Sequence, residues 1–249
     1  MRQRRASRKV PHFERLRARL VPAGAGLTLL AFIVVSWWTI THSSTFQLLG
    51  DYVARIETAE KVVALTFDDG PHPIHTPRML DLLDRHGVKA TFFMMGRNVE
   101  RFPEVAREVI RRGHEAGNHS YSHPKLIWMA PWAIREEIDR TDQLLRNLGV
   151  TGPIHFRPPH AVKFVVLPYV LYKSRRLSVL GYMDPKEWKQ RPAEVMVLSV
   201  LDQVRPGSII PLHDPHGLET FKTVDTVLTE LLARGYRFEV VSEFVRRQP

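Results

Sequence analysis

From residue 61 onward, the chain alternates short apolar runs with amphipathic segments. The runs are rich in β-branched and aromatic residues and predict buried strands, whereas the segments between them repeat apolar residues at helical spacing. The predicted strands are 62–67, 90–95, a short segment ending at Asn118, 154–157, 177–183, 208–213 and 238–241. The predicted helices are 77–86, 103–112, 132–148, 193–204 and 221–234. Each of the first three helices is followed directly by a glycine, which is a common helix stop.

This alternation determines the expected fold class. Seven strands separated by helices predict a parallel sheet with crossover helices. Seven units also fit an α/β barrel, whose active site lies at the C-terminal ends of the strands. A chain of 249 residues is long enough for one such domain, and nothing in the sequence requires two.

An uncharged stretch, residues 20–40, precedes this pattern. As a helix it would be about 31 Å long, enough for a bilayer core of about 30 Å. Trp37 and Trp38 stand at its far end, where interfacial aromatic residues belong. A transmembrane signal-anchor helix is therefore predicted. A buried core helix and a cleaved signal peptide are the alternatives. Against the latter, the run is longer than a signal peptide's apolar region, and no clear cleavage site follows Trp38.

The formal net charge of +10 is typical of proteins that bind nucleic acid, but the distribution of the charge argues against such a partner. Residues 1–20 hold eight basic side chains and one acid, so the tail carries +7 and the remainder only +3. No nucleic-acid partner is therefore expected. By the positive-inside rule the tail stays cytoplasmic, and the domain faces the periplasm or the cell exterior as part of a single-pass inner-membrane protein. The absence of cysteine excludes disulfides and thiolate metal sites.

Titratable residues stand at the ends of the predicted strands. They are Asp68, Asp69, His119, His123, Arg157, Asp184, Glu187 and His213. Each residue taken alone is a weak indication of a functional site. Asp-Asp-Gly-Pro usually forms a solvated turn, and an isolated pair of histidines four residues apart is often coincidence. Together they contain two imidazoles and a carboxylate, which suit a divalent ion. They also provide a second carboxylate as general base and a separate histidine as general acid.

These segments, in this order, resemble the polysaccharide deacetylase family, the NodB-homology domain of chitin and peptidoglycan deacetylases. The motifs Thr-Phe-Asp68-Asp69-Gly-Pro and His119-Ser-x-x-His123 are specific as a pair, and the resemblance covers about residues 61–244. It implies a distorted (β/α)7 barrel, which agrees with the seven predicted strands. The predicted organisation is a cytoplasmic tail, a transmembrane helix, a stem and a NodB-homology catalytic domain, at 1–19, 20–40, 41–60 and 61–249.

The resemblance implies a role for each titratable group. Asp69, His119 and His123 would bind a divalent metal ion, commonly zinc in this family, with cobalt, nickel and manganese as other candidates. Asp68 would be the general base for the attacking water. Arg157 would hold Asp68 charged and oriented.

It also implies residues that act on the leaving group and on the substrate. His213 would protonate the departing sugar amine, and Glu187 would fix His213. The implied substrate-binding residues are Pro158, Pro159, His160, Trp188 and Leu212. The last two of these would form the wall of the acetyl pocket.

Three positions depart from the family pattern. His160-Ala161 stands where Tyr-Gly is usual, Glu187 replaces an aspartate, and Pro211 precedes Leu212 where an aliphatic residue is expected. The family uses the backbone N–H at the tyrosine position, so that donor is retained. A proline removes a ladder donor and favours a strand edge or a bulge.

The predicted function is metal-dependent removal of N-acetyl groups from an N-acetylhexosamine glycan, such as peptidoglycan, an exopolysaccharide or a chitin-like polymer. One alternative is a catalytically weak or inactive glycan-binding barrel that assists polysaccharide export. The other is hydrolysis of a different non-peptide carbon–nitrogen amide bond. A binding module would be free to lose Asp68 or His213, and this chain retains both.

Overall fold

The computed structural model describes residues 12–43, 45–181, 192–214 and 217–247, without the side chains of 12–25 and 27. The chain divides into two compact units, Met1–Thr41 and His42–Pro249. Helix α1 (His12–His42) contains the whole of the predicted helix 20–40 and extends beyond it at both ends. Among the side chains that the structure describes, no helix is both long and apolar enough to cross a membrane.

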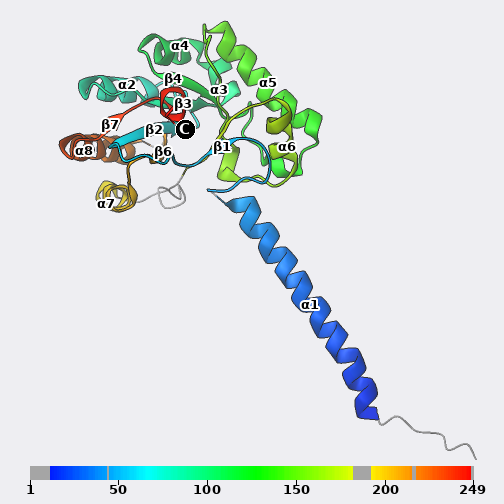
Figure 1. The fold of residues 1–249 in the computed structure, drawn as a ribbon. Coiled ribbons are helices and arrows are strands. Elements are labelled where there is room, and N and C mark those ends of the chain that lie inside the picture. The colour runs from blue at the N-terminus through cyan, green and yellow to red at the C-terminus, as the bar shows by residue number, and fades with distance from the viewer. Residues whose placement is uncertain (1–11, 44, 182–191, 215–216, 248–249) are drawn as a thin grey trace, which may run out of the picture. The chain divides into compact units, whose positions relative to one another are not determined.

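The second unit is an α/β fold built on parallel strands (Figure 1). The strands are β1 (Tyr52–Val53), β2 (Val62–Asp68), β3 (Thr91–Met94), β4 (Glu115–Asn118), β5 (Ser178–Val179), β6 (Ile209–His213) and β7 (Arg237–Phe238). Five of them form one sheet in the order β4-β3-β2-β6, with β7 paired to the first residues of β2. A separate ladder joins β1 to β5. All these ladders are parallel, as the alternating pattern predicts.

Isolated bridges connect the five-stranded sheet and the β1–β5 ladder into an irregular ring. Phe156 bridges the end of β4 at Asn118 and also β5 at Ser178. On the opposite side, Arg55 bridges Ser208 in an antiparallel sense, and the Ile56 N–H donates to the Gly207 carbonyl at 3.0 Å. The result is a distorted barrel in which single bridges replace full ladders at two places.

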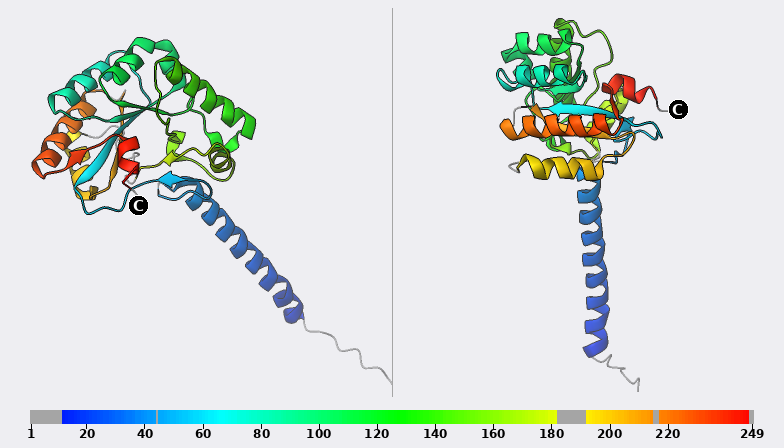
Figure 2. Two further views of the ribbon diagram at one scale, coloured as in Figure 1. Left: turned by 45° about the horizontal axis from the view of Figure 1, so that its top comes forward. Right: turned by 90° about the vertical axis from the view of Figure 1, so that its left-hand side faces the viewer.

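The helices pack around these strands (Figure 2). The α-helices of this unit are α2 (His75–Arg85), α3 (Gly96–Arg101), α4 (Pro103–Arg111), α5 (Pro131–Asn147), α6 (Val166–Lys173), α7 (Ala193–Gln203), α8 (Leu218–Ala233) and α9 (Val241–Val245). Two short 3-10 helices, η1 (Leu126–Trp128) and η2 (Pro159–Ala161), lie in loops. Every residue of β2 is buried, as expected for a central strand covered on both faces.

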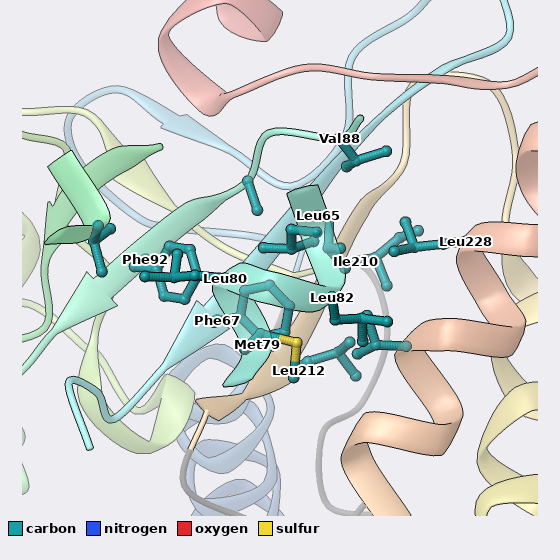
Figure 3. Close-up of a cluster of buried hydrophobic side chains, with 14 of the residues drawn as sticks. Leu65, Phe67, Met79, Leu80, Leu82, Val88, Phe92, Ile210, Leu212 and Leu228 are labelled. Carbon is teal, nitrogen blue, oxygen red and sulfur yellow. The ribbon is translucent and has the colours of Figure 1, made fainter. Parts of the chain in front are cut away.

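A large apolar cluster fixes the positions of β2, β3 and β6 (Figure 3). Phe67 of β2 stacks on Phe92 of β3 with ring centroids 4.9 Å apart. Met79 and Leu80 of α2 and Leu228 of α8 are buried in the same cluster. Burial of this area holds the three strands in one register, so their C-terminal ends lie side by side.

The longer predicted elements are confirmed to within three residues, and the short ones require correction. The predicted strand 154–157 forms only the bridges at Phe156, because the two prolines that follow Arg157 have no N–H to donate to a ladder. The predicted strand 238–241 shortens to β7, since the Val241 N–H donates to the Thr91 hydroxyl at 2.9 Å and starts α9. Of the predicted strand 177–183, only β5 forms a ladder; residues 182 and 183 lie outside the described part.

The sequence pattern did not predict β1, α3, α6 or α9. The range 41–60, predicted as a stem, contains β1 and two buried residues, Val53 and Ile56, that pack in a second apolar cluster. Helix α6 lies in an almost continuous apolar run that contains a proline, Pro168. Such a run has no helical periodicity, so its pattern does not predict a helix.

Candidate active site

The site lies at the C-terminal ends of β2 and β6. Asp68 is the last residue of β2 and is the ladder partner of His213, the last residue of β6. Both side chains therefore belong to adjacent strands at the same level. The register of one parallel ladder brings together the two residues predicted as general base and general acid.

Asp68 is held by a buried ion pair with Arg157. Arg157 Nη1 donates to Asp68 Oδ1 at 2.8 Å and to the Thr66 hydroxyl at 2.7 Å, and its Nε donates to the Val179 carbonyl at 3.3 Å. Its guanidinium carbon lies 4.2 Å from the centre of the Phe93 ring. Such contacts offset the cost of burying both charges and fix the direction of the carboxylate.

Asp69, His119 and His123 converge as predicted for metal ligands. Asp69 Oδ1 lies 3.5 Å from His119 Nε2 and 3.2 Å from His123 Nε2. One ligand atom from each residue lies within 4.8 Å of the other two. His119 Nδ1 contacts the Arg157 carbonyl at 2.8 Å, which orients the ring with Nε2 toward Asp69.

The chemistry of this group fits a divalent transition ion. Two imidazole nitrogens and one carboxylate oxygen would hold such an ion and would leave coordination positions for water or substrate. Burial, with a smaller contribution from His119, lowers the pKa of His123 to about 4, so its imidazole is neutral near pH 7. A neutral imidazole is the form that coordinates a metal.

The backbone around these ligands is unusual. Six non-glycine residues in the described part of the chain have a positive φ, and five of them line this site: Asp69, Ser120, His123, His160 and Ala161. Left-handed backbone at non-glycine residues costs free energy and is retained where the surroundings enforce it. Two of the strained positions, Asp69 and His123, are candidate metal ligands, and the other three are their neighbours in the loops after β4 and after Arg157.

Several polar residues that sequence reasoning missed support this backbone. Asn98 Nδ2 donates to the Asp69 carbonyl at 2.8 Å, and the Ser120 N–H donates to Asn118 Oδ1 at 2.8 Å. Glu137 of α5 accepts from the Ser122 hydroxyl at 2.8 Å and from two backbone N–H groups. No pattern along the chain links a helical glutamate to a loop fifteen residues earlier, so only the structure reveals this role.

His213 is partly buried, and the carboxylates of Asp68 and Asp69 act on its charge. Burial lowers its pKa, while the negative charges of Asp68 and Asp69 act in the opposite direction. Its neighbour Leu212 is buried. Pro211 lies in β6, which in the described part pairs only with β2, so the missing N–H is at the sheet edge as predicted.

Some of the remaining predicted residues lie at the site, and others lie outside the described residues. His160 lies against His123, with ring centroids 4.3 Å apart, and Pro159 before it is buried. Pro158 directly follows Arg157 and is buried as well. Glu187 and Trp188 lie outside the described residues, as does Asp184, so their roles stay predictions.

Asp214 is a buried carboxyl that the sequence did not single out. The Thr76 hydroxyl donates to Asp214 Oδ2. A Cβ on Gly70 would lie 2.5 Å from the same oxygen, so this close approach requires glycine after Asp69. Burial raises the pKa of Asp214 to about 7. The residue therefore ties the end of β6 to the loop that follows the aspartate pair.

This raised pKa predicts a pH-dependent stability. The folded state retains a proton on Asp214 up to about pH 7 that the unfolded state loses near pH 4, so its contribution to stability is complete below pH 4 and lost as the pH rises to 7. As the pH rises from 4 to 8, the free energy of unfolding of Asp214→Asn should increase by on the order of a few kcal/mol relative to that of the unsubstituted protein. Urea unfolding at several pH values measures this difference, with exposed Asp225→Asn as control. If the free energies of unfolding of Asp214→Asn and of the unsubstituted protein changed with pH in parallel, the prediction would be contradicted.

Comparisons with known proteins show the family of the chain. The family profile described as Polysaccharide deacetylase matches residues 55–172. A chitooligosaccharide deacetylase of Azorhizobium caulinodans is 35% identical over 162 residues, which are 65% of this chain and 77% of the relative. The chain belongs to the polysaccharide deacetylase family.

Other similar members of the polysaccharide deacetylase family are named for peptidoglycan. A peptidoglycan-N-acetylglucosamine deacetylase of Bacillus cereus is 36% identical over 179 residues. The match covers 71% of this chain and 65% of that relative, less than two thirds of its length. The crystal structure of a peptidoglycan N-acetylglucosamine deacetylase has a TM-score of 0.73 at 32% identity, covering 78% of this chain and 92% of that one. The α/β fold predicted from the NodB-homology motifs is thus the fold of a solved family member.

Proposed function

We propose that this protein is a metal-dependent hydrolase that removes N-acetyl groups from a glycan containing N-acetylhexosamine. The observation that carries the proposal is the pairing of Asp68 with His213 across one ladder, beside the Asp69, His119 and His123 group. A base, an acid and a set of metal ligands at one strand edge are the groups that amide hydrolysis needs. The names of the similar family members support an acetylated amino sugar as the substrate.

In the first step, Asp68 acts as the general base. A divalent ion held by Asp69, His119 and His123, zinc being our first candidate, would supply Lewis acidity that polarises the acetyl carbonyl and makes water easier to deprotonate. Asp68 accepts the water proton as the water oxygen attacks the carbonyl carbon. Arg157 keeps Asp68 ionised and aimed by its 2.8 Å hydrogen bond. The oxyanion that forms needs a donor, which the backbone N–H of His160 supplies by family resemblance.

In the second step, His213 acts as the general acid. The carbon–nitrogen bond breaks, and His213 donates a proton to the departing amine, which is a poor leaving group without it. Burial lowers the pKa of His213, and the carboxylates of Asp68 and Asp69 oppose that shift, so they offset part of the cost of the protonated imidazole that this step requires. The products are acetate and a free amino sugar.

Acetate release from several substrates tests the function. We expect release from peptidoglycan or an N-acetylglucosamine oligomer, dependent on added zinc, cobalt or another divalent ion. The oligomer should react faster than free N-acetylglucosamine, because contacts with neighbouring sugars add binding that one sugar lacks. Equal rates would remove the polymer claim and leave the deacetylase chemistry. Glycan binding without acetate release under all metal conditions would instead favour the non-catalytic alternative.

We further propose that residues 20–40 anchor the protein in the cytoplasmic membrane, with the catalytic domain outside. The stretch is uncharged, follows a +7 tail, and lies within α1. Leu29, Leu30, Phe32, Ile33, Val34 and Val35 of that helix are each more than half exposed. A reporter active only in the periplasm, fused after Pro249, should give signal. A signal only from a cytoplasm-specific reporter would reverse the topology.

A further inference from the structure

An exposed apolar patch lies on two neighbouring segments of the second unit. It consists of six side chains, each between 38% and 59% exposed: Phe46, Leu48, Leu49, Val165, Tyr169 and Tyr172. The segment that precedes β1 passes beside α6 (Figure 1), and a Cβ on Gly50 would lie 3.3 Å from the Tyr172 backbone. The two segments therefore form one surface. Contiguous exposed apolar surface is typical of sites that contact a membrane or another protein.

The part of the apolar patch on α6 is one face of an amphipathic helix. Val165, Tyr169 and Tyr172 follow one another at intervals of four and three residues, so they lie on the same face. The opposite face is buried in an apolar cluster through Leu167, Val170 and Leu171. Because that face holds the helix in place, the exposed stripe has a fixed direction.

The other part of the apolar patch is fixed by buried polar groups. Gln47 is 4% exposed, and its Nε2 donates to the Leu49 carbonyl at 2.7 Å. Lys163 is 1% exposed, and its Nζ donates to the Ser43 carbonyl. The chain that enters the second unit is thus held against the residues that lead into α6. Its apolar side chains remain exposed beside the stripe on that helix.

Two features of the chain indicate that lipid contacts the apolar patch. Phe46 follows Ile40, the last residue of the proposed anchor, by six residues, so the backbone can separate them by no more than about 22 Å. Residues 143–183 contain no aspartate or glutamate, and Lys173 and Arg175 are exposed at the end of α6. Tyrosines and aliphatic side chains beside basic residues are the composition of protein surfaces that lie at lipid headgroups.

We propose that the apolar patch docks on the lipid surface of the membrane that holds the anchor, with Tyr169 and Tyr172 at the level of the headgroups. The inference rests on the proposed anchoring by residues 20–40 and goes beyond it, because an anchor alone leaves the domain free to move on its connection. Lipid is the one partner that the chain itself keeps within reach of the patch. The tyrosine rings suit this depth, since each has an apolar body and a hydroxyl that stays hydrated.

Fluorescent labels at three positions test the docking. The chain has no cysteine, so one introduced cysteine places a single label. Leu30→Cys reports on the anchor, Leu48→Cys on the patch, and Leu232→Cys on α8, where the side chain is 37% exposed and lies outside the patch. The full-length protein is placed in nanodiscs of phosphatidylcholine and phosphatidylglycerol. Some of their lipids carry a nitroxide quencher, either near the headgroup or at the end of the acyl chain.

We expect the headgroup nitroxide to quench the Leu48 label at least about twice as strongly as the Leu232 label, because a surface-bound apolar face lies about 5–10 Å into the headgroup boundary. The chain-end nitroxide should quench the Leu30 label. Adding Tyr169→Glu/Tyr172→Glu should lower quenching of the Leu48 label to the level of the Leu232 label, since two charges oppose insertion. Leu218→Glu/Leu232→Glu, which places two charges on exposed positions of α8, is the matched control and should leave it unchanged.

The outcomes separate the docking from the anchor. Equal quenching of the Leu48 and Leu232 labels, beside a quenched Leu30 label, would overturn the docking and leave the anchor intact. The docking would also be overturned by Leu48 quenching that survives Tyr169→Glu/Tyr172→Glu. A Leu48 label that is shielded from water but not quenched by lipid would indicate a second copy of the chain as the occupant. An unquenched Leu30 label would overturn the proposed anchoring itself, so the two failures are distinguishable.

Discussion

Asp68→Asn should lower the rate of acetate release by about 10²-fold or more while the metal content stays unchanged. The amide has the shape of the carboxylate and can still accept the Arg157 hydrogen bond, but it cannot take a proton from water. The metal ligands are separate side chains, so metal binding should survive. The measurements are kcat with the best glycan substrate and metal per chain by elemental analysis.

Stability must be measured beside activity in this experiment. Removing the Asp68 charge leaves the buried Arg157 guanidinium without its 2.8 Å counterion, which is expected to lower the melting temperature. Asp81→Asn is a suitable control, because its carboxylate is 59% exposed and pairs with Arg112 on the surface. A folded Asp68→Asn protein with normal turnover would show that Asp68 only supports its neighbours.

Replacing both histidine ligands should abolish metal binding. The protein is expected to hold one divalent transition ion per chain, and His119→Ala/His123→Ala should hold none after dialysis, because one carboxylate cannot retain a borderline ion. Zinc should raise the melting temperature of the unsubstituted protein, since a ligand that binds only the folded state stabilises it. The double variant should lose this rise.

His86→Ala provides the matched control for the metal experiment. His86 pairs with Asp225 at 2.7 Å and is not one of the three residues in the candidate metal group. Its removal should leave metal content and the zinc-induced rise in melting temperature intact. Full metal content in the double variant would mean that the ion binds elsewhere and that Asp69, His119 and His123 form an ordinary polar cluster.

The sequence predicted those parts of the fold that periodicity can encode. β2, β3 and β6 are continuous apolar runs, and α2, α4, α5, α7 and α8 repeat apolar residues at helical spacing, so both kinds of element are visible locally. β1, β5 and β7 are only two residues long and exist because a neighbouring strand lies beside them. Their pairing depends on partners far away in the chain, which no local pattern contains.

The same division holds for the site. The sequence by itself determined which residues are available at the strand ends. Asp68, Asp69 and His213 follow apolar runs, and His119 and His123 follow the short predicted strand that ends at Asn118. The tertiary structure decided their geometry: the ladder register that pairs Asp68 with His213, and the Arg157 contact across the barrel. It also decided the close contacts of Asp214 with Gly70 and of His160 with His123. These depend on backbone angles and on packing between distant segments, and both are set only when the whole core assembles.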